Sequence, residues 1–340
     1  MNAIDPSKIM QIGMGFWASK TLLTAVNMNL FTHLATGEKS GQQIQQLLGL
    51  HERSLYDFLD TLVALGFLQR SGLKENSSYS NTPDVNLFLD KNKPTYIGGI
   101  LEMSNNRLYP FWNDLEEALK TGKPQNESKS GEAPLFEAIY SDKDRLREFL
   151  HAMGGVQAGN FDFFARNFDF SGFNTHCDIG GSGGNLSVHI AKNNKHIKSL
   201  SFDLPPVAPI AESNFKALGF DDRIKAVAGD FFKDDLPKAE LITMSNVLHD
   251  WGHKDKKMLI QKAYNALPDN GTLAVIENII DNERNKNAFG LMMSLNMLIE
   301  TDEGSDYTLN DFEEWASEAG FKKITIMPLT GPASAIIASK

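Results

Sequence analysis

The sequence predicts an α/β protein in two parts, a helical N-terminal domain and a larger domain built on a mostly parallel sheet. Three observations support this prediction. The chain has 340 residues, which is more than one hydrophobic core usually organises. Its N-terminal third carries apolar side chains at helical spacing. From His176 onward, short apolar runs alternate with helical patterns, which is typical of βαβ units in a Rossmann-like domain.

We expect three segments along the chain. Residues 1–100 form a helical domain, residues 101–170 form a connector whose helices contribute to a substrate pocket, and residues 171–340 form the sheet domain. A polar stretch over residues 121–134 predicts a loop, and helical spacing resumes over residues 135–167.

Composition narrows the class of partner and the compartment. The net charge of −10 argues against a nucleic-acid partner held by bulk electrostatics. No stretch approaches the roughly 18 uninterrupted apolar residues of a membrane helix, and the N-terminus lacks a signal-peptide pattern. The single cysteine, Cys177, excludes an internal disulfide framework and a multi-cysteine zinc site. We therefore expect a cytoplasmic protein with no nucleic-acid, membrane or metal partner.

The N-terminal elements follow a winged-helix-like pattern. Helices are predicted over residues 16–35 and 52–70, with a short helix between Gly41 and Gly49 and two short strands over residues 67–83. This order raises a DNA-binding hypothesis. The candidate recognition helix is acidic, however, and phosphates would repel it. Its charged residues include Glu52, Asp57 and Asp60 against one basic residue, Arg53. A packing or dimerisation module is the favoured interpretation.

The sheet strands are short apolar runs separated by helical patterns. They are expected at residues 176–180, 199–204, 224–229, 240–246, 272–279, 322–328 and 334–339. The last two are too close in sequence for a helical crossover, so they predict an antiparallel hairpin.

Polar residues follow the first three predicted strands, where open α/β sheets bind their ligands. The first strand runs into "DIGGSGGN", whose glycines let the backbone approach a ligand closely. The second ends on Asp203 and Leu204, and Asp203 lies 203 − 184 = 19 residues after Gly184. This spacing suits a carboxylate that holds ribose hydroxyls. The third ends in "AGDFF", where Asp230 and Phe231 could bind an adenine.

These strand ends suit S-adenosylmethionine (SAM) better than a dinucleotide. A pyrophosphate asks for G-x-G-x-x-G directly after the strand, whereas here Asp178 stands two residues before Gly180. Asp178 would repel a phosphate but can bind an ammonium group. SAM has an ammonium group, a ribose and an adenine, and it has no phosphate. The expected cofactor-binding residues are Asp178, Gly180, Gly181, Ser182, Asp203, Leu204, Gly229, Asp230 and Phe231.

The motifs "DIGGSGG", "FDLP", "GDFF", "LHDW" and "LPDNGTLAVIE", in this order and spacing, closely resemble the cation-independent small-molecule O-methyltransferases. That family includes caffeate and flavonoid enzymes of plants, acetylserotonin methyltransferases and bacterial antibiotic-tailoring enzymes. The resemblance covers essentially the whole chain. It implies a homodimer formed through the N-terminal domain, SAM as cofactor with S-adenosylhomocysteine as product, and no metal. It also implies that His249 of "LHDW" is the general base.

Two positions depart from the family pattern. Ser182 replaces the third glycine of the first motif, a small change that the turn should tolerate. Ser245 stands four residues before His249, where the family commonly has Lys or Arg. A contact to the methionine part of the cofactor must therefore differ, and Ser245 joins the expected cofactor-binding residues.

A histidine with a pKa near ~6.5 can remove the proton of a phenol, whose own pKa is near ~10. Such a base needs a partner on its other ring nitrogen. Glu277, at the end of a neighbouring strand, is predicted to be that partner. Asp306 aligns with a second acidic residue of the family, and Asp250 is expected beside the substrate or cofactor.

A further set of residues is expected to line the acceptor pocket. The methionines and Asn296 share one predicted helix, and methionine walls adapt to aromatic acceptors as readily as they fill a core. The candidate substrate contacts are Phe149, Met153, Asn246, Asp250, Met293, Asn296 and Met297.

The leading hypothesis is transfer of a methyl group from SAM to a hydroxyl of a small aromatic or polyketide-like molecule. The same scaffold suits transfer to carbon, nitrogen or sulfur, or use of SAM without methylation. A third hypothesis, from another class, is a winged-helix regulator that senses a metabolite. The acidic helix and His249 weigh against it. The sequence does not identify the acceptor, because variable apolar residues line its pocket.

Overall fold

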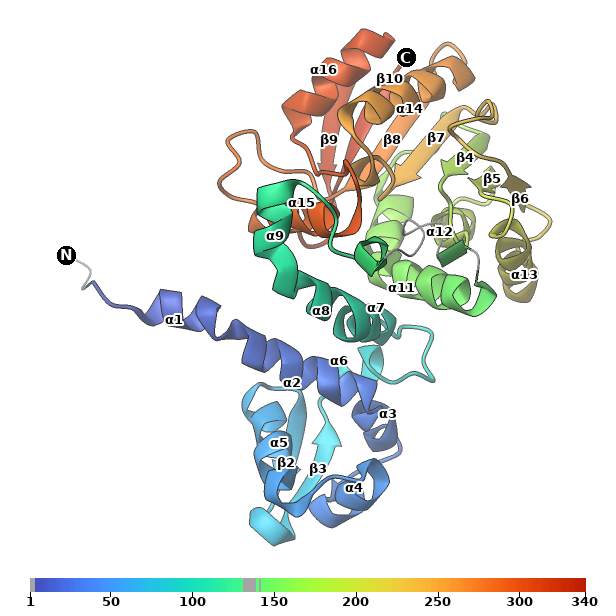
Figure 1. Ribbon diagram of the computed structural model, residues 1–340. Helices are drawn as coiled ribbons and strands as arrows, with labels where there is room; N and C mark the ends of the chain where they lie inside the picture. Colours follow the sequence, from blue (N-terminus) through green and yellow to red (C-terminus); the bar gives the residue numbers. More distant parts are fainter. Residues whose placement is uncertain (1–3, 131–138, 141) are drawn as a thin grey trace. The chain divides into compact units, whose positions relative to one another are not determined.

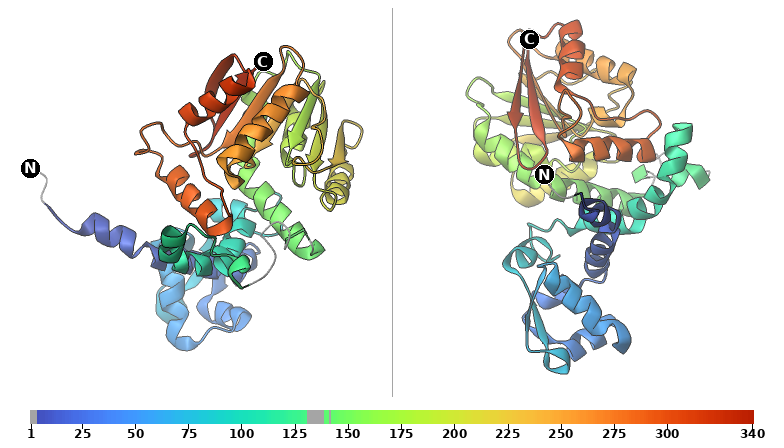
Figure 2. Two further views of the ribbon diagram at one scale, coloured as in Figure 1. Left: turned by 45° about the horizontal axis from the view of Figure 1, so that its top comes forward. Right: turned by 90° about the vertical axis from the view of Figure 1, so that its left-hand side faces the viewer.

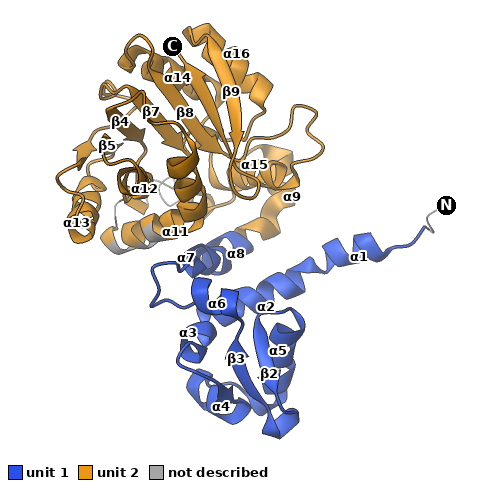
Figure 3. Ribbon diagram, turned by 180° about the vertical axis from the view of Figure 1, so that it is seen from behind, with its two compact units in different colours: residues 1–110 blue, residues 111–340 orange. Residues whose placement is uncertain are grey.

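The structure is a computed structural model that describes residues 4–130, 139–140 and 142–340 (Figure 1). It divides into two compact units, Met1–Pro110 and Phe111–Lys340, which Figure 3 colours separately. The first residues of the helical segment predicted at 135–167 lie outside the described residues. None of the helices in these described ranges combines the length and the apolar character needed to cross a membrane.

The first unit combines helices with a three-stranded antiparallel sheet in the order β1-β3-β2. Its strands are β1 (Lys39–Ser40), β2 (Leu68–Ser71) and β3 (Ser78–Asn81), with a 3₁₀-helix η1 (Lys74–Asn76) between the last two. Its helices are α1 (Ser7–Gly13), α2 (Gly15–Asn27), α3 (Leu30–Leu34), α4 (Gly41–Leu48), α5 (Glu52–Ala64), α6 (Pro83–Phe88), α7 (Gly98–Met103) and the π-helix η2 (Ser104–Leu108), and α8 (Tyr109–Phe111) follows. The two helices and the antiparallel pair predicted after residue 40 appear in the predicted order, and β1 adds a strand too short to leave a sequence pattern.

The single helix predicted over residues 16–35 is wrong, because the chain breaks it at Asn29. This residue has a φ of +58°, a left-handed conformation that cannot continue a right-handed helix. The break turns the chain so that α3 buries Leu30, Phe31 and Leu34 in the core of the unit. Apolar spacing continues across the break, so periodicity alone could not detect it.

Helix α4 begins and ends where its sequence predicts. The Ser40 side chain accepts from the Gln43 backbone N–H, and the Gln43 side chain accepts from the Ser40 backbone in return. Gly49 ends the helix with a φ of +64°, which glycine adopts without steric cost.

The second unit is a seven-stranded sheet with helices on both faces. Its strands are β4 (Thr175–Ile179), β5 (Lys198–Asp203), β6 (Ile224–Ala228), β7 (Leu241–Ser245), β8 (Thr272–Glu277), β9 (Lys323–Pro328) and β10 (Ser334–Ser339). Its helices are η3 (Trp112–Asp114), α9 (Leu115–Thr121), η4 (Glu127–Ser130), α11 (Lys143–Asn167), α12 (Asn185–Asn193), α13 (Ala208–Leu218), η5 (Leu248–Asp250), α14 (His253–Ala266), α15 (Ala288–Glu300) and α16 (Leu309–Ala319).

The predicted strands and hairpin are confirmed. The sheet order is β6-β5-β4-β7-β8-β10-β9; β4 to β8 pair in parallel, and β10 pairs antiparallel with both β8 and β9. Every residue of β8 is buried, as expected when helices cover both faces of a strand.

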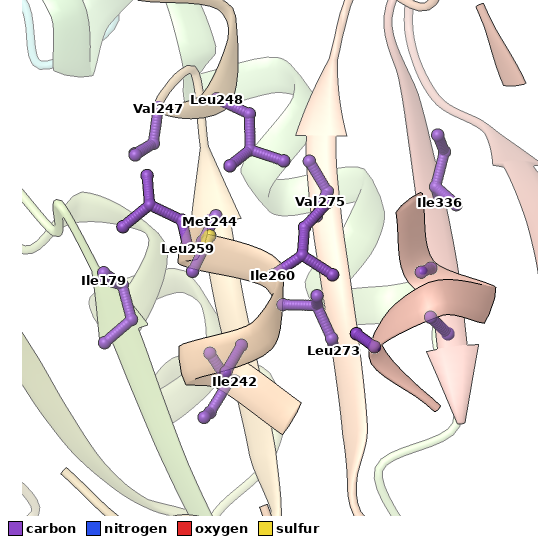
Figure 4. Close-up of a cluster of buried hydrophobic side chains, with 14 of the residues drawn as sticks. Ile179, Ile242, Met244, Val247, Leu248, Leu259, Ile260, Leu273, Val275 and Ile336 are labelled. Atoms are coloured by element: carbon purple, nitrogen blue, oxygen red, sulfur yellow. The ribbon is translucent and has the colours of Figure 1, made fainter. Parts of the chain in front are cut away.

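Alternate residues of the central strands enter two different cores. Leu273 and Val275 pack with α14 and α16 on one face of the sheet. Figure 4 labels both residues among the side chains of this cluster. Ala274 and Ile276 pack with α11 and α12 on the other face. The views in Figure 2 show these helices on opposite sides of the sheet.

The position of the candidate site follows from the strand order. The chain proceeds from β4 outward through β5 and β6, then returns to the other side of β4 with β7 and β8. Adjacent connections therefore leave β4 and β7 in opposite directions, and open α/β sheets bind ligands at the carboxyl ends of the strands at such a switch point. The motif residues after these strands all lie at this edge.

Candidate active site

The turn between β4 and α12 brings backbone close to the neighbouring elements. Gly180 has a φ of +68°, and a Cβ there would lie 2.6 Å from the Val247 side chain. Gly184 has a φ of +80°, and a Cβ there would lie 2.1 Å from the Phe215 ring. The N–H groups of Gly180 and Gly181 donate to the carbonyl of Phe202 on β5, at 2.9 and 3.2 Å. Only glycine fits both left-handed positions, so these two residues fix the backbone conformation of the turn.

Ser182 occupies the third left-handed position of this turn, with a φ of +55°. Its backbone N–H donates to Oδ2 of Asp203 at 2.8 Å, which ties the turn to the end of β5. Its buried Oγ has no hydrogen-bond partner among the described residues.

Two carboxylates lie at the ends of β4 and β5: Asp178, which is buried, and Asp203, which is half-buried. Asp203 Oδ1 accepts from the Leu204 N–H at 2.7 Å, and Asp178 Oδ1 accepts from the Thr243 hydroxyl at 2.7 Å. Burial raises the pKa of Asp203 to about 6 and that of Asp178 to about 7, and the charge of Asp203 contributes to the second shift. Such carboxylates favour a bound cation, which would restore their ionised form.

A buried chain of side chains leads to Asp178, and sequence reasoning missed it. Thr243 donates to Asp178, so its oxygen accepts from Nε2 of His176 at 2.9 Å. Nδ1 of His176 then accepts from the Ser199 hydroxyl at 3.0 Å. Burial lowers the pKa of His176 to about 3, so the ring is neutral and its tautomer is set by these partners. The residue alternates with Asp178 along an ordinary strand pattern, so no local signal marks it.

The turn after β6 places Asp230 and Phe231 at the same edge. Gly229 donates its N–H to the Asp203 carbonyl at 2.9 Å. Asp230 Oδ1 accepts from the Phe232 N–H at 2.9 Å, and its Oδ2 lies 2.8 Å from Nζ of Lys233. Burial acts to raise the pKa of Asp230, but Lys233 and the Phe232 N–H outweigh it and lower that pKa.

Phe231 belongs to an aromatic group beside the site. Its ring meets the Trp251 ring edge-on at 5.8 Å, and Phe232 meets the same indole at 4.6 Å. Nζ of Lys262 on α14 donates to the Phe231 carbonyl at 2.6 Å. Trp251 therefore packs against the rings of Phe231 and Phe232.

His249 lies in η5, directly after β7, with 4% of its surface exposed. Its Nδ1 is 3.4 Å from Oδ1 of Asp306, and its Nε2 is 3.6 Å from Oδ1 of Asp250. The ring thus has a carboxylate near each nitrogen. Ser305 donates its backbone N–H to the His249 carbonyl at 2.8 Å, which holds the Asp306 segment against η5.

Glu277 contacts the backbone of η5, whereas the sequence predicts it as the partner of the ring. Its Oε1 accepts from the N–H groups of Val247, Leu248 and His249, at 3.1, 2.8 and 3.3 Å. Glu277, at the end of β8, thereby provides the hydrogen-bond acceptor for three backbone N–H groups of the tight turn that leads into η5. The carboxylates near the ring nitrogens are those of Asp306 and Asp250.

The carboxylates around His249 control its proton affinity. Burial disfavours the imidazolium, but Asp250, Asp306 and Glu277 outweigh burial and raise the pKa of His249 to about 10. Burial raises the pKa of Asp250 to about 7, although the charge of His249 opposes this shift. Burial also raises the pKa of Glu277.

The predicted substrate residues include two asparagines that have hydrogen-bond partners within the chain and three methionines that differ in burial. Asn246, with a φ of +52°, accepts from the Gln157 amide at 3.1 Å, and Asn296 accepts from the Trp112 indole N–H at 2.9 Å. Met297 is buried on α15, whereas Met293 on α15 and Met153 on α11 are half-buried.

Phe149 and Tyr140 come from the chain segment around the start of α11. Phe149 packs against a small cluster that includes Val207 from the β5–α13 connection. Tyr140 was not predicted. Burial and the charges of Asp203 and Asp250 raise its pKa, which places its phenol in the field of the candidate site. It stands in the segment predicted as helical over residues 135–167, where the spacing gives no sign that this tyrosine acts on the site.

Two family models match the chain and together span most of it. An O-methyltransferase domain matches residues 112–322, and an O-methyltransferase dimerisation domain matches residues 10–91. The tetracenomycin polyketide synthesis 8-O-methyl transferase TcmO of Streptomyces glaucescens is 36% identical, over 98% of this chain and 97% of that protein. The N,N-dimethyltransferase OxyT of Streptomyces rimosus is 28% identical, over 92% of this chain and 90% of that protein.

A solved structure shares the whole architecture. Human N-acetylserotonin methyltransferase in complex with SAM superposes with a TM-score of 0.90 at 28% identity, covering 100% of this chain and 99% of the human chain. The domain matches, the identity to TcmO and this fold agree with the motif residues at the strand ends. This chain belongs to the SAM-dependent O-methyltransferase family.

Proposed function

We propose that this protein transfers a methyl group from SAM to a hydroxyl of a small aromatic or polyketide-like molecule, with His249 as the general base. The observation that carries this proposal is the imidazole between Asp306 and Asp250, at the edge of the sheet that also carries the glycine turn. A buried histidine with one carboxylate near each nitrogen accepts a proton strongly, because the carboxylates stabilise the imidazolium.

The residues present fit SAM. The buried Oγ atoms of Ser182 and Ser245 have no partner among the described residues, so each can bind a ligand. Asp178 can take the ammonium group and Asp203 the ribose hydroxyls, because burial leaves both short of compensating positive charge. The cofactor-binding set proposed is Asp178, Gly180, Gly181, Ser182, Asp203, Leu204, Gly229, Asp230, Phe231 and Ser245. When bound, SAM supplies an electrophilic methyl group on a sulfonium sulfur.

The side chains of the site then accept the proton of the acceptor hydroxyl and stabilise the charge that it brings. The acceptor hydroxyl gives its proton to Nε2 of His249 as its oxygen attacks, while Nδ1–H faces Asp306. Asp306 stabilises the imidazolium that forms, and Glu277 holds the turn that carries the ring. The surrounding carboxylates favour the charged ring, and a cation bound at this edge opposes them because like charges disfavour the imidazolium.

The acceptor class rests on the relatives. TcmO is named as an 8-O-methyl transferase of polyketide synthesis, and the human structure as an N-acetylserotonin methyltransferase. Phe149, Met153, Met293 and Met297 supply soft apolar side chains for such a ring. OxyT is named as an N,N-dimethyltransferase, so an amine is the second candidate acceptor.

The test is a labelled-SAM assay of wild type and His249→Ala against a panel of phenols and amines. We expect turnover of a phenol to fall by about 10²–10⁴-fold, the usual contribution of a positioned base. SAM affinity, measured by calorimetry, should stay within about threefold. The exposed His253 provides the matched control, and His253→Ala should behave as wild type. Activity should also survive a chelator, because no metal enters the proposed reaction.

Raising the pH should partly restore His249→Ala on a phenol, because solution then supplies the phenolate. Wild-type turnover by His249→Ala at neutral pH would remove His249 from the reaction. Turnover of amines alone would assign the protein to N-methylation instead.

A further inference from the structure

Lys256 is a fully buried lysine that the reaction above does not use. It lies in the first turn of α14 with 0% of its surface exposed. Lysine is almost never fully buried unless a partner compensates its charge, because removing an ammonium group from water is costly. Its surroundings therefore call for an explanation.

The ammonium group binds the segment that carries Asp306. Nζ donates to the backbone carbonyl of Ser305 at 2.6 Å and to its Oγ at 3.0 Å. It also lies 5.5 Å from the centre of the Tyr307 ring and 6.0 Å from that of Trp315. The strongest contacts of Lys256 are thus to the residue directly before Asp306.

The segment has supports on either side of Ser305: the Asp306 N–H donates to Oγ of Ser294 at 3.2 Å, and the Tyr307 carbonyl accepts from the Ile280 N–H at 3.0 Å. Ser305, Asp306, Tyr307 and Thr308 line a cavity of about 450 Å³, so one side of the segment is open. On the other side, the Ser305 N–H donates to the His249 carbonyl at 2.8 Å. Lys256 and the backbone of η5 therefore hold Ser305 from two directions and place the Asp306 carboxylate at the imidazole.

The charge of Lys256 also faces the acidic groups of the site. The carboxylates that act on it are Glu277 at the end of β8, Asp250 in η5, and Asp306 and Asp311 around the start of α16. Among the described residues, no carboxylate lies within ion-pair distance of Nζ, so this charge acts on the cluster as a whole. The titratable groups that act on His249 are Asp250, Asp306 and Glu277. Lys256 and Tyr307 interact with Glu277 and Asp306, and Glu300 of α15 acts on Asp250.

We propose that Lys256 is a positioning residue: it anchors Ser305 so that Asp306 meets Nδ1 of His249, and its charge offsets the carboxylates around the imidazole. This inference rests on the proposed role of His249 as general base. It makes Lys256 a determinant of the pH range in which the ring is neutral, without any contact to substrate or cofactor.

The experiment compares the pH dependence of kcat for wild type and three variants. Lys256→Met replaces the lysine by a side chain of similar length that has neither the charge nor the hydrogen-bond donors to Ser305. We expect kcat near pH 7 to fall by about 10-fold or more, and the alkaline rise of kcat to move to higher pH by about one unit. The direction follows because loss of a cation favours the imidazolium, and only the neutral ring accepts a proton. The KM for SAM should stay within about twofold.

Two further variants separate charge from anchoring. Lys256→Arg keeps the charge, so the pH rise should stay near its wild-type position even if kcat falls. Ser305→Ala removes one acceptor and leaves the charge, so it should lower kcat without moving the pH rise. Lys254→Met, an exposed lysine in the same helix turn, is the matched control and should match wild type throughout.

A Lys256→Met enzyme with the wild-type pH rise would overturn the inference, whether or not its melting temperature falls, because a packing role alone predicts no pH shift. If Lys256→Met does not fold, Lys256→Gln serves in its place, because it retains a donor for Ser305 but no charge. The outcome for His249→Ala is separate. Wild-type turnover in that variant removes the proposed base, whereas an inactive His249→Ala enzyme with an unshifted Lys256→Met profile refutes only the role of Lys256.

Discussion

At the scale of single residues, the candidate site is a collection of buried acids with too little positive charge. Asp178 and Asp203 have pKa values raised by burial, and His249 is surrounded by Asp250, Glu277 and Asp306. Each pKa unit corresponds to about 1.4 kcal/mol of preference for one protonation state. These carboxylates lack compensating positive charge, and a cationic ligand would stabilise their ionised form. This favours SAM over an anionic cofactor.

The first prediction at this scale concerns SAM affinity as a function of pH. The pKa values of Asp203 and Asp178, about 6 and about 7, mean that both carboxylates lose charge as the pH falls through this range. A bound cation prefers the ionised form, so SAM binding should release protons here and weaken as the pH falls from about 7.5 to 5.5. Calorimetry at several pH values measures this.

Asp178→Asn should weaken SAM binding by about 10-fold at pH 7.5 and flatten the pH dependence. Affinity of the wild type that is constant between pH 5.5 and 7.5 would contradict the assignment of these two carboxylates to the cofactor.

At the scale of elements, tight connections rather than long helices determine the site. The β4–α12 turn contains three left-handed positions, and η5 takes its N–H partners from Glu277 at the end of β8. Such turns have few internal hydrogen bonds, so they depend on the sheet for their shape. Ser182 is the one non-glycine at these left-handed positions, and this conformation costs a serine roughly 1–2 kcal/mol.

Ser182→Gly therefore should not destabilise the protein. Relief of the left-handed strain and the greater entropy of glycine in the unfolded chain oppose each other, which leaves a change between zero and about 1 kcal/mol in favour of folding. Chemical denaturation of the protein without SAM measures it. Ser187→Gly in the interior of α12 is the matched control, because glycine costs about 1 kcal/mol in a helix. Equal destabilisation by both variants would show that Ser182 is not strained.

At the scale of the whole molecule, the first unit exposes apolar side chains that a folded chain normally covers. Helix α1 has no buried residue and points away from the rest of its unit (Figures 1 and 2). Ile9, Ile12 and Trp17 are 75%, 72% and 63% exposed. Together with the match of residues 10–91 to an O-methyltransferase dimerisation domain, this surface supports the proposal of a homodimer.

Light scattering at micromolar concentration should give twice the chain mass of 37.7 kDa. Ile12→Glu places a charge on the apolar surface and should shift the protein toward monomer. Leu218 on α13 is also exposed, and Leu218→Glu should leave the dimer intact. A wild-type protein with the mass of one chain would exclude this homodimer under the conditions of the assay.

The predictions that succeeded depend on features that are local in sequence. The seven strands of the second unit follow apolar runs between turn residues, and the α4 boundaries follow Gly41 and Gly49. The glycine turn could be recognised in the sequence because the left-handed backbone at positions 180 and 184 requires glycine. These elements could be predicted because neighbouring residues alone determine their backbone.

Tertiary structure alone decided which groups meet. Asp306, 306 − 249 = 57 residues after His249, lies at the ring, whereas Glu277 binds the backbone of η5. Lys256 and His176 look like ordinary residues of an amphipathic helix and a strand until the fold buries Lys256 against Ser305 and His176 between Ser199 and Thr243. By itself the sequence determined the sheet and the family to which the chain belongs, because periodicity and turn residues are local features of the sequence. The partners of the base, and the charges that tune it, depend on which chain segments pack together, and only the folded chain decides that.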